Sequence, residues 1–165
     1  MTAPLPGILR QLHASLATHA PEQAITILQE AGYAAGEGLY KAFIAVNNPA
    51  DLDADLLAPT LSEFFTSGGW GAVAVTPVGT GALAVDSSDW AEAEPGTSET
   101  PMCFFSAGML ADFLGRLSEE TVAVMEVECR SKGDERCRFL SATPAVLEKV
   151  YTEMTQGRRY EDALA

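Results

Sequence analysis

The sequence predicts an α+β fold, with a helical N-terminal region followed by a four-stranded antiparallel sheet made of two hairpins. One helix is expected between the hairpins and another at the C-terminus. Apolar residues recur at helical spacing as far as about residue 67, and the pattern changes to strand-like alternation from residue 72. A second pair of alternating segments flanks a turn around Gly133, which favours a second hairpin.

The first third of the chain has helical patterns. The first helix is predicted from the spacing of Ile8, Leu9, Leu12 and Leu16. Pro21 suits the first turn of a second helix, whose apolar pattern runs to Val46 and is ended by the prolyl segment 47–49. Glycines interrupt this pattern, so we expect either a break near Gly32 or close backbone packing there. A further helix is predicted over residues 55–66.

Strands and helices then alternate. Residues 72–78 and 81–85 are predicted strands joined by a glycine-rich turn, and an acidic loop follows over 86–99. Thr100-Pro101 has the residue types of a helix start, and that helix is expected to end near Gly115. After the second hairpin, Thr143-Pro144 is expected to open the C-terminal helix.

Composition limits the class of protein. At 165 residues we expect a single domain, with a helical part over about 1–67 and a motif-bearing α/β part over about 68–157. The chain is 47% hydrophobic and 20% charged, which argues against disorder, and no apolar run is long enough for a membrane span. A net charge of −13 makes nucleic acid an unfavourable partner. Residues 1–7 lack the pattern of a signal peptide, so a cytoplasmic location with reduced thiols is expected.

The cysteines are the main chemical feature. Alternation along residues 121–129 puts Cys129 on the same strand face as Met125, and Glu126 on the opposite face. A hairpin symmetric about Gly133 places Cys129 opposite Cys137, with Cβ atoms about 4.5–5.5 Å apart, unless a bulge shifts the register.

Cys103 is expected near the N-terminus of its helix, where the helix dipole favours a thiolate. Three thiols supply most of a tetrahedral zinc site. Asp86, Asp89 and Glu92 are candidates for a fourth ligand. Inert buried thiols are the alternative, because free cysteine is a common core residue.

An apolar cavity between the helices and the sheet is a further expectation. The residues predicted to line it are Phe104, Phe105, Met109, Phe113, Met125 and Phe139, with Trp70 and Trp90 at its rim. An ordinary packed core is the alternative for each of them. Catalytic patterns are sparse, because nucleotide and phosphate-binding loops are missing and His13 and His19 fit exposed or capping positions better.

The cysteine pattern resembles the 4-vinyl reductase domain family, which includes bacteriochlorophyll-associated proteins and the aromatic-sensing domains of some NtrC-type activators. The resemblance covers roughly residues 68–147, and its fold is related to that of TRAPP subunits. It is carried by Cys103-x4-Gly108 and by Glu128-Cys129-x3-Gly133-x3-Cys137-x-Phe139.

In the aromatic-sensing branch, three cysteines and a glutamate hold zinc. The resemblance therefore implies Zn²⁺ bound by Cys103, Cys129 and Cys137. The glutamate has no clear counterpart between Val85 and Glu92, where Asp89 is the nearest candidate. The resemblance also implies a homodimer, in which Gly32 and Gly36 would permit close contact between N-terminal helices.

Three functions are consistent with these observations. The leading hypothesis is a non-catalytic sensor or carrier of a hydrophobic, aromatic or tetrapyrrole-like ligand, with zinc serving the structure. The second is a reductase or accessory enzyme acting on a vinyl tetrapyrrole in bacteriochlorophyll biosynthesis. The third is a TRAPP-like assembly subunit without a cavity.

Overall fold

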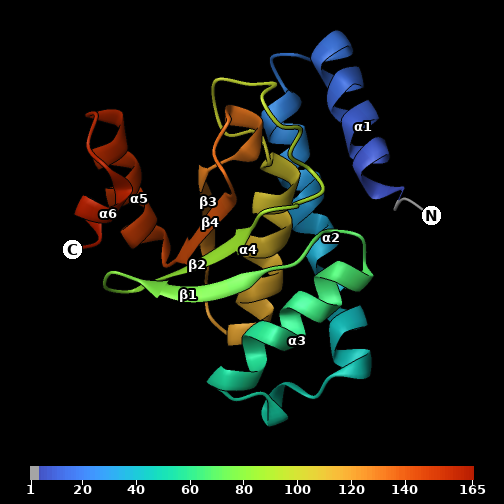
Figure 1. Cartoon of the computed structure of the whole chain (residues 1–165), viewed down its shortest axis with the longest axis vertical. Coiled ribbons are helices and arrows are strands. Elements are labelled where there is room, and N and C mark those ends of the chain that lie inside the picture. The colour runs from blue at the N-terminus through green and yellow to red at the C-terminus, as the bar shows by residue number, and fades with distance from the viewer. Residues whose placement is uncertain (1–3) are drawn as a thin grey trace.

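The computed structural model describes residues 4–165, so the first three residues of the predicted helical region lie outside the described part. Within this range the chain forms six helices and a four-stranded sheet, which confirms the α+β class (Figure 1). The elements in chain order are α1 (Leu5–His19), α2 (Ala24–Val46), α3 (Ala54–Ser67), β1 (Ala74–Val78), β2 (Ala82–Ser87), α4 (Phe104–Ser118), β3 (Ala123–Glu128), β4 (Cys137–Ala142), α5 (Pro144–Thr155) and α6 (Tyr160–Ala163), with 3-10 turns at Pro49–Asp51 and Arg130–Lys132.

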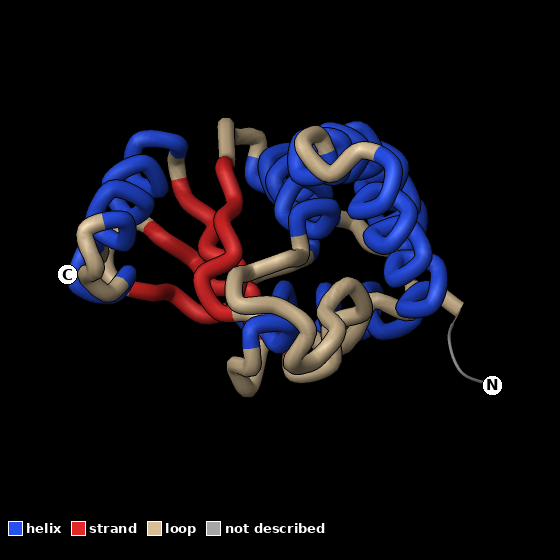
Figure 2. Tube along the Cα trace, turned by 90° about the horizontal axis from the view of Figure 1, so that it is seen from above, coloured by secondary structure: helices blue, strands red, loops and turns tan. Residues whose placement is uncertain are grey.

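The sheet joins the two predicted hairpins through their inner strands. Its order is β1-β2-β4-β3 with every pair antiparallel, and Val85 of β2 lies opposite Phe139 of β4. Helices cover both faces, with α5 and α6 on one side and the remaining helices on the other (Figure 2). Two apolar clusters result, a larger one between the sheet and α4 and a smaller one under α5 and α6.

Helix α2 is continuous through Gly32, so the break that was one of our two expectations is wrong and the close packing is right. A Cβ atom at Gly32 would lie far inside van der Waals contact of the Phe105 carbonyl oxygen of α4. A Cβ atom at Gly108 of α4 would lie similarly close to the Gln29 carbonyl oxygen of α2. Gly36 also faces α4, so these glycines bring two helices of one chain together, and the contact expected between subunits is made within the subunit.

Some helix boundaries differ from the sequence prediction. Helix α4 begins at Phe104, and Cys103 rather than Thr100 is its N-cap residue. The helix continues past Gly115 to Ser118 and is closed by Glu119 in the left-handed conformation. Thr100 and Pro101 belong to the irregular segment before the helix, so the cap-and-proline pattern predicted the helix a few residues too early.

A bulge in β3 changes the face on which Cys129 lies. Glu126 pairs with Phe139 and Glu128 pairs with Arg138, so Val127 is the extra residue. The predicted shared face of Met125 and Cys129 is therefore wrong, because Met125 packs under α5 while Cys129 lies in the larger cluster. After the bulge the register is the one that a hairpin symmetric about Gly133 requires, which brings Cys129 beside Cys137 as predicted.

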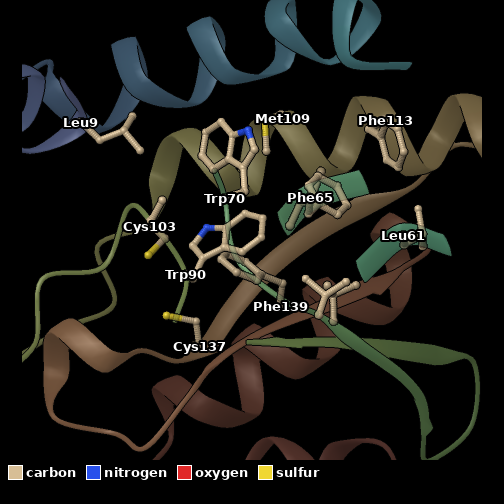
Figure 3. Close-up of a cluster of buried hydrophobic side chains, with 14 of the residues drawn as sticks. Leu9, Leu61, Phe65, Trp70, Trp90, Cys103, Met109, Phe113, Cys137 and Phe139 are labelled. Atoms are coloured by element: carbon tan, nitrogen blue, oxygen red, sulfur yellow. The ribbon is translucent and has the colours of Figure 1, made fainter. Parts of the chain in front are cut away.

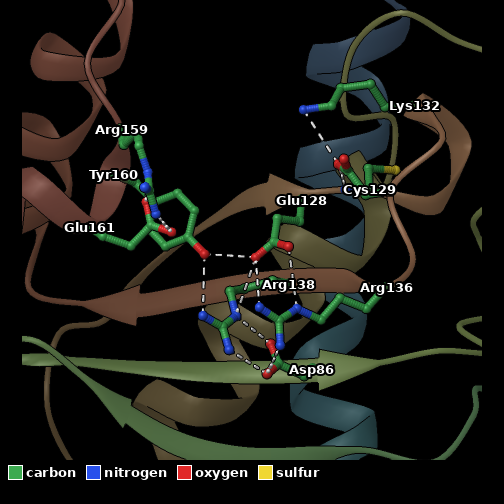
Figure 4. Close-up of polar contacts among 10 residues, drawn as sticks. Asp86, Glu128, Cys129, Lys132, Arg136, Arg138, Arg159, Tyr160 and Glu161 are labelled. Atoms are coloured by element: carbon green, nitrogen blue, oxygen red, sulfur yellow. Dashed lines mark hydrogen bonds and ion pairs between the residues drawn. The ribbon is translucent and has the colours of Figure 1, made fainter.

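Polar side chains on the face of the sheet that α5 and α6 cover connect three strands to α6 (Figure 4). Arg138 donates from Nε and Nη2 to the two carboxylate oxygens of Asp86, each at 2.7 Å. The Tyr160 hydroxyl of α6 donates to Glu128 Oε2 at 2.7 Å and accepts from Arg138 Nη1 at 3.2 Å. Arg136 also donates to Asp86 and Glu128.

Replacing Arg138 with methionine is expected to lower the free energy of unfolding by about 2–4 kcal/mol, because Asp86 would lose its bidentate partner in a nearly buried position. Replacing Arg159, whose side chain is 74% exposed and pairs with Glu161, is expected to change it by less than about 0.5 kcal/mol. Urea denaturation followed by circular dichroism measures both. Equal losses in the two variants would contradict a stabilising role for the network.

Candidate metal centre and ligand cavity

Three cysteines and one glutamate converge at the N-terminus of α4. Cys103 is the cap residue of that helix, Glu126 lies in β3, Cys129 follows the bulge and Cys137 begins β4. One ligand atom from each of these residues lies within 4.8 Å of all the others. The sulfur atoms of Cys103 and Cys129 are 3.9 Å apart, and the three cysteines are buried and free of disulfides. Figure 3 shows Cys103 and Cys137 beside the aromatic cluster.

The carboxylate of Glu126 tests whether a cation fits this group. Its Oε2 atom accepts a hydrogen bond from the Cys103 backbone N–H at 3.0 Å. Its Oε1 atom has no hydrogen-bond partner, the one buried side-chain nitrogen or oxygen atom of this kind in residues 4–165. An unpartnered buried carboxylate oxygen is costly unless a cation compensates it. Three sulfurs and one carboxylate oxygen form a donor set that suits tetrahedral zinc, so the residues fit the metal.

The close approach of these groups shifts their pKa values. Burial raises the pKa of Glu126 to about 8, and the neighbouring Cys129 adds to this rise. Hydrogen bonds from Cys103, and then from Cys137, lower the pKa of Cys129. Bound zinc would displace the proton that this raised pKa keeps on Glu126 at neutral pH, because metal ligands act as carboxylates and thiolates.

The predicted fourth ligands lie elsewhere. Asp89 Oδ1 accepts from the Ala72 N–H at 3.0 Å and from Ser87 Oγ at 3.1 Å, so it orders a turn. Asp86 pairs with Arg138 on the face of the sheet that α5 and α6 cover. Glu92 caps the first turn of α4. Glu126, rather than Asp89, lies close enough to the three cysteines to share a metal ion with them.

Most of the residues predicted to line a cavity pack against one another. Met109, Phe113, Phe139, Trp70 and Trp90 belong to the larger buried cluster (Figure 3). Phe105 packs against that cluster. The Trp70 ring stacks on Trp90 at a centroid distance of 5.4 Å and on Phe105 at 6.0 Å. Met125 lies on the other side of the sheet, and Phe104 alone of the predicted set lines the cleft along α1 described next.

A cleft of about 560 Å³ lies between α1, the start of α2 and the segment 91–104, and we call it the α1 cleft. His13 lines it and bonds through Nε2 to Glu92 Oε1 at 2.8 Å. The sequence favours an exposed or capping position for His13 and gives no signal for this contact, because the partner is 79 residues away. Another cleft, of about 490 Å³, lies between α3, the end of α4 and the sheet.

Comparisons with known proteins agree with this fold and cluster. A sequence model of the vinyl-4-reductase domain, abbreviated V-4-R, matches residues 88–142, which include all four residues of the cluster. The chain is 30% identical over 144 residues to the bacteriochlorophyll synthase 23 kDa chain of Cereibacter sphaeroides, covering 78% of this chain and 65% of that relative.

Solved structures provide the comparison of folds. The phenol-responsive sensory domain of the transcription activator PoxR, solved with phenol, has a TM-score of 0.64 at 14% identity over 87% of this chain and 76% of that one. A vinyl-4-reductase family protein from Methanocaldococcus jannaschii has a TM-score of 0.40 at 19% identity, covering 86% and 95%.

The chain is therefore an α+β domain with the fold of the PoxR sensory domain. Residues 88–142 match the sequence model of the vinyl-4-reductase domain, which confirms the family resemblance predicted from the cysteine spacing. None of the helices in residues 4–165 has the length and apolar character needed to cross a membrane.

Proposed function

We propose that this chain is a small-molecule-binding domain that acts as a sensor or carrier, with zinc bound by Cys103, Glu126, Cys129 and Cys137. The ligand is a hydrophobic, aromatic or tetrapyrrole-like molecule. The unpartnered Glu126 Oε1 atom beside three buried sulfurs supports the zinc site, and the clefts of about 560 and 490 Å³ support ligand binding. The likeness to a domain solved with phenol supports a fold suited to small ligands.

The zinc ion would have a structural role rather than a catalytic one. A closed site with four protein ligands leaves no position for substrate, which is typical of structural zinc. Its ligands come from the cap of α4, from β3 and from β4, so the metal would join the helix to the second hairpin. The clefts, rather than the metal, would then hold the ligand.

Elemental analysis and native mass spectrometry of untagged protein test the metal and any retained ligand. We expect one zinc per chain. Thermal unfolding with phenol and with a free-base porphyrin tests ligand binding, because a ligand that binds the folded state must raise the melting temperature. A zinc-free protein would count against the zinc site. The absence of a melting-temperature shift with both compounds would count against ligand binding.

A role in vinyl tetrapyrrole chemistry is the second candidate, favoured by the identity to the bacteriochlorophyll synthase chain. The chain spans about 65% of that relative's length, so the activity of the whole relative is carried over only as a proposal. Reduction of a divinyl tetrapyrrole with NADPH supplied, followed by absorption spectroscopy, tests it. Persistent inactivity of zinc-loaded protein would favour the carrier over the enzyme.

The proposal includes a homodimer, as the resemblance implies. Sedimentation of the purified protein tests it. A monomer at micromolar concentration would contradict the homodimer without affecting ligand binding. A co-purifying partner protein, in place of a small ligand, would favour the TRAPP-like alternative.

A further inference from the structure

The α1 cleft is separate from the aromatic cluster. Its wall on α1 is a single stripe of that helix, made of Pro6, Arg10, His13, Ala14 and Ala17. At about 1.5 Å per residue this stripe extends about 16 Å, which suits an elongated occupant better than a single ring. The facing wall is the start of α2 and the segment 91–104.

The mouth of the cleft carries charges that are already paired. Arg10 lies 3.4 Å from Glu94, and both side chains are about half exposed. His13 lies deeper and bonds to Glu92, whose side chain is fully buried. A charged head group would have to compete with one of these existing pairs, whereas a neutral head group would leave both pairs intact, so the mouth favours a neutral head group.

His13 is suited to form a hydrogen bond with a hydroxyl head group. The Glu92 carboxylate accepts from the N–H groups of Phe105 and Ser106, at 3.1 and 2.7 Å, and from the Ser106 hydroxyl. Because the Glu92 carboxylate accepts from these donors, His13 Nε2 donates to it, and Nδ1 is then the ring nitrogen available to a hydroxyl group, which can donate or accept a hydrogen bond. Nδ1 has no hydrogen-bond partner in the part of the chain that the structure describes.

The other end of the cleft is apolar. Its side chains are small along α1, at Ala14 and Ala17, and Leu28 of α2 and Phe104 of α4 also line it. From Arg10 to Ala17 the helix rises about 10 Å, about the length of a medium alkyl chain. The volume of about 560 Å³ falls within the range of small-ligand sites.

We propose that the α1 cleft binds a neutral, single-tailed amphiphile, with a hydroxyl head beside His13 and the tail between Ala17 and Phe104. This inference rests on the proposed ligand-binding function and names a site and a class of ligand for it. The hydroxyl head forms a hydrogen bond with His13 Nδ1, and burial of the tail against α1 and α2 adds affinity.

Calorimetric titration of the purified full chain with 1-octanol, 1-hexanol, octanoate and octylamine tests the proposal. Burial of two further methylene groups should make 1-octanol bind about fifteenfold more tightly than 1-hexanol. Octanoate and octylamine should bind more weakly than 1-octanol. Equal affinity for the three octyl compounds would overturn the assignment of a neutral head.

Variants locate the site. Ala17→Phe should fill the apolar end and abolish 1-octanol binding, and His13→Leu should weaken binding about fivefold through the lost hydrogen bond. Ser15→Phe is the matched control, because Ser15 is an exposed residue of the same helix outside the cleft lining. Unchanged 1-octanol binding to Ala17→Phe would overturn the proposal, provided that circular dichroism shows the variant folded.

The other outcomes separate this inference from the proposed function. A melting-temperature rise with phenol or porphyrin but not with 1-octanol would overturn the α1 cleft assignment and leave the function standing. Failure of every compound would overturn both. If Ala17→Phe instead dissociates a dimer in sedimentation, a second copy of the chain covers the cleft and the amphiphile proposal is wrong.

Discussion

Replacing Gly32 with alanine is expected to lower the free energy of unfolding by about 3 kcal/mol or more. The new Cβ atom would collide with the Phe105 carbonyl oxygen and approach the Met109 backbone nitrogen, and neither backbone atom can turn away as a flexible side chain would. The two helices must therefore separate, which exposes part of the larger buried cluster. Urea denaturation followed by circular dichroism measures the loss.

Gly38 provides the control in the same helix. A Cβ atom there meets nothing within 4 Å, so Gly38→Ala should stabilise the protein by about 0.5–1 kcal/mol through helix propensity. Opposite signs for the two substitutions would identify packing as the cause. A similar small effect at both positions would contradict the backbone contact between α2 and α4.

The effect of Gly32→Ala should extend to the metal centre. Phe105, the residue that meets the new methyl group, is two residues from Cys103 at the cap of α4. Movement of this turn changes the position of one sulfur relative to the hairpin that carries the other two. We therefore expect reduced zinc content in Gly32→Ala and normal content in Gly38→Ala.

The sequence predicted the elements better than it predicted their contacts. Helical spacing located α2, but a glycine in a helix is compatible with a break or with a close neighbour, and only the position of α4 decides between them. The cap signal at Thr100 failed because Cys103 is the N-cap residue, and Glu92, which is distant in sequence, accepts hydrogen bonds from the first-turn N–H groups.

The candidate site shows the same limit. The three cysteines were identified from their spacing, and their convergence is observed. Strict alternation places Glu126 away from Cys129, and the extra residue Val127 reverses that result. A glutamate three residues before a hairpin cysteine was the available signal, but it requires a bulge that the residue types do not specify.

The proposed fourth ligand has the most direct test. Glu126→Gln should release or greatly weaken zinc and lower the free energy of unfolding by about 3 kcal/mol or more, because metal-binding energy contributes to folding. Asp89→Asn is the matched control, since Asp89 orders a turn and lies outside the cluster; it should keep zinc and lose about 1 kcal/mol. Zinc-to-protein ratios by elemental analysis and urea denaturation measure both variants.

The pattern across both variants distinguishes zinc from inert thiols. Cys129→Ser should behave like Glu126→Gln if the cluster binds metal, and chelation of the unmodified protein should reproduce the same loss. Because thiols must release protons to bind zinc, the loss on chelation should be larger at neutral pH than at about pH 5, where protons compete with the metal. A zinc-loaded Glu126→Gln variant beside a zinc-free Asp89→Asn variant would instead make Asp89 the ligand, and would require the turn at Ala72 to rearrange so that its carboxylate reaches the sulfurs.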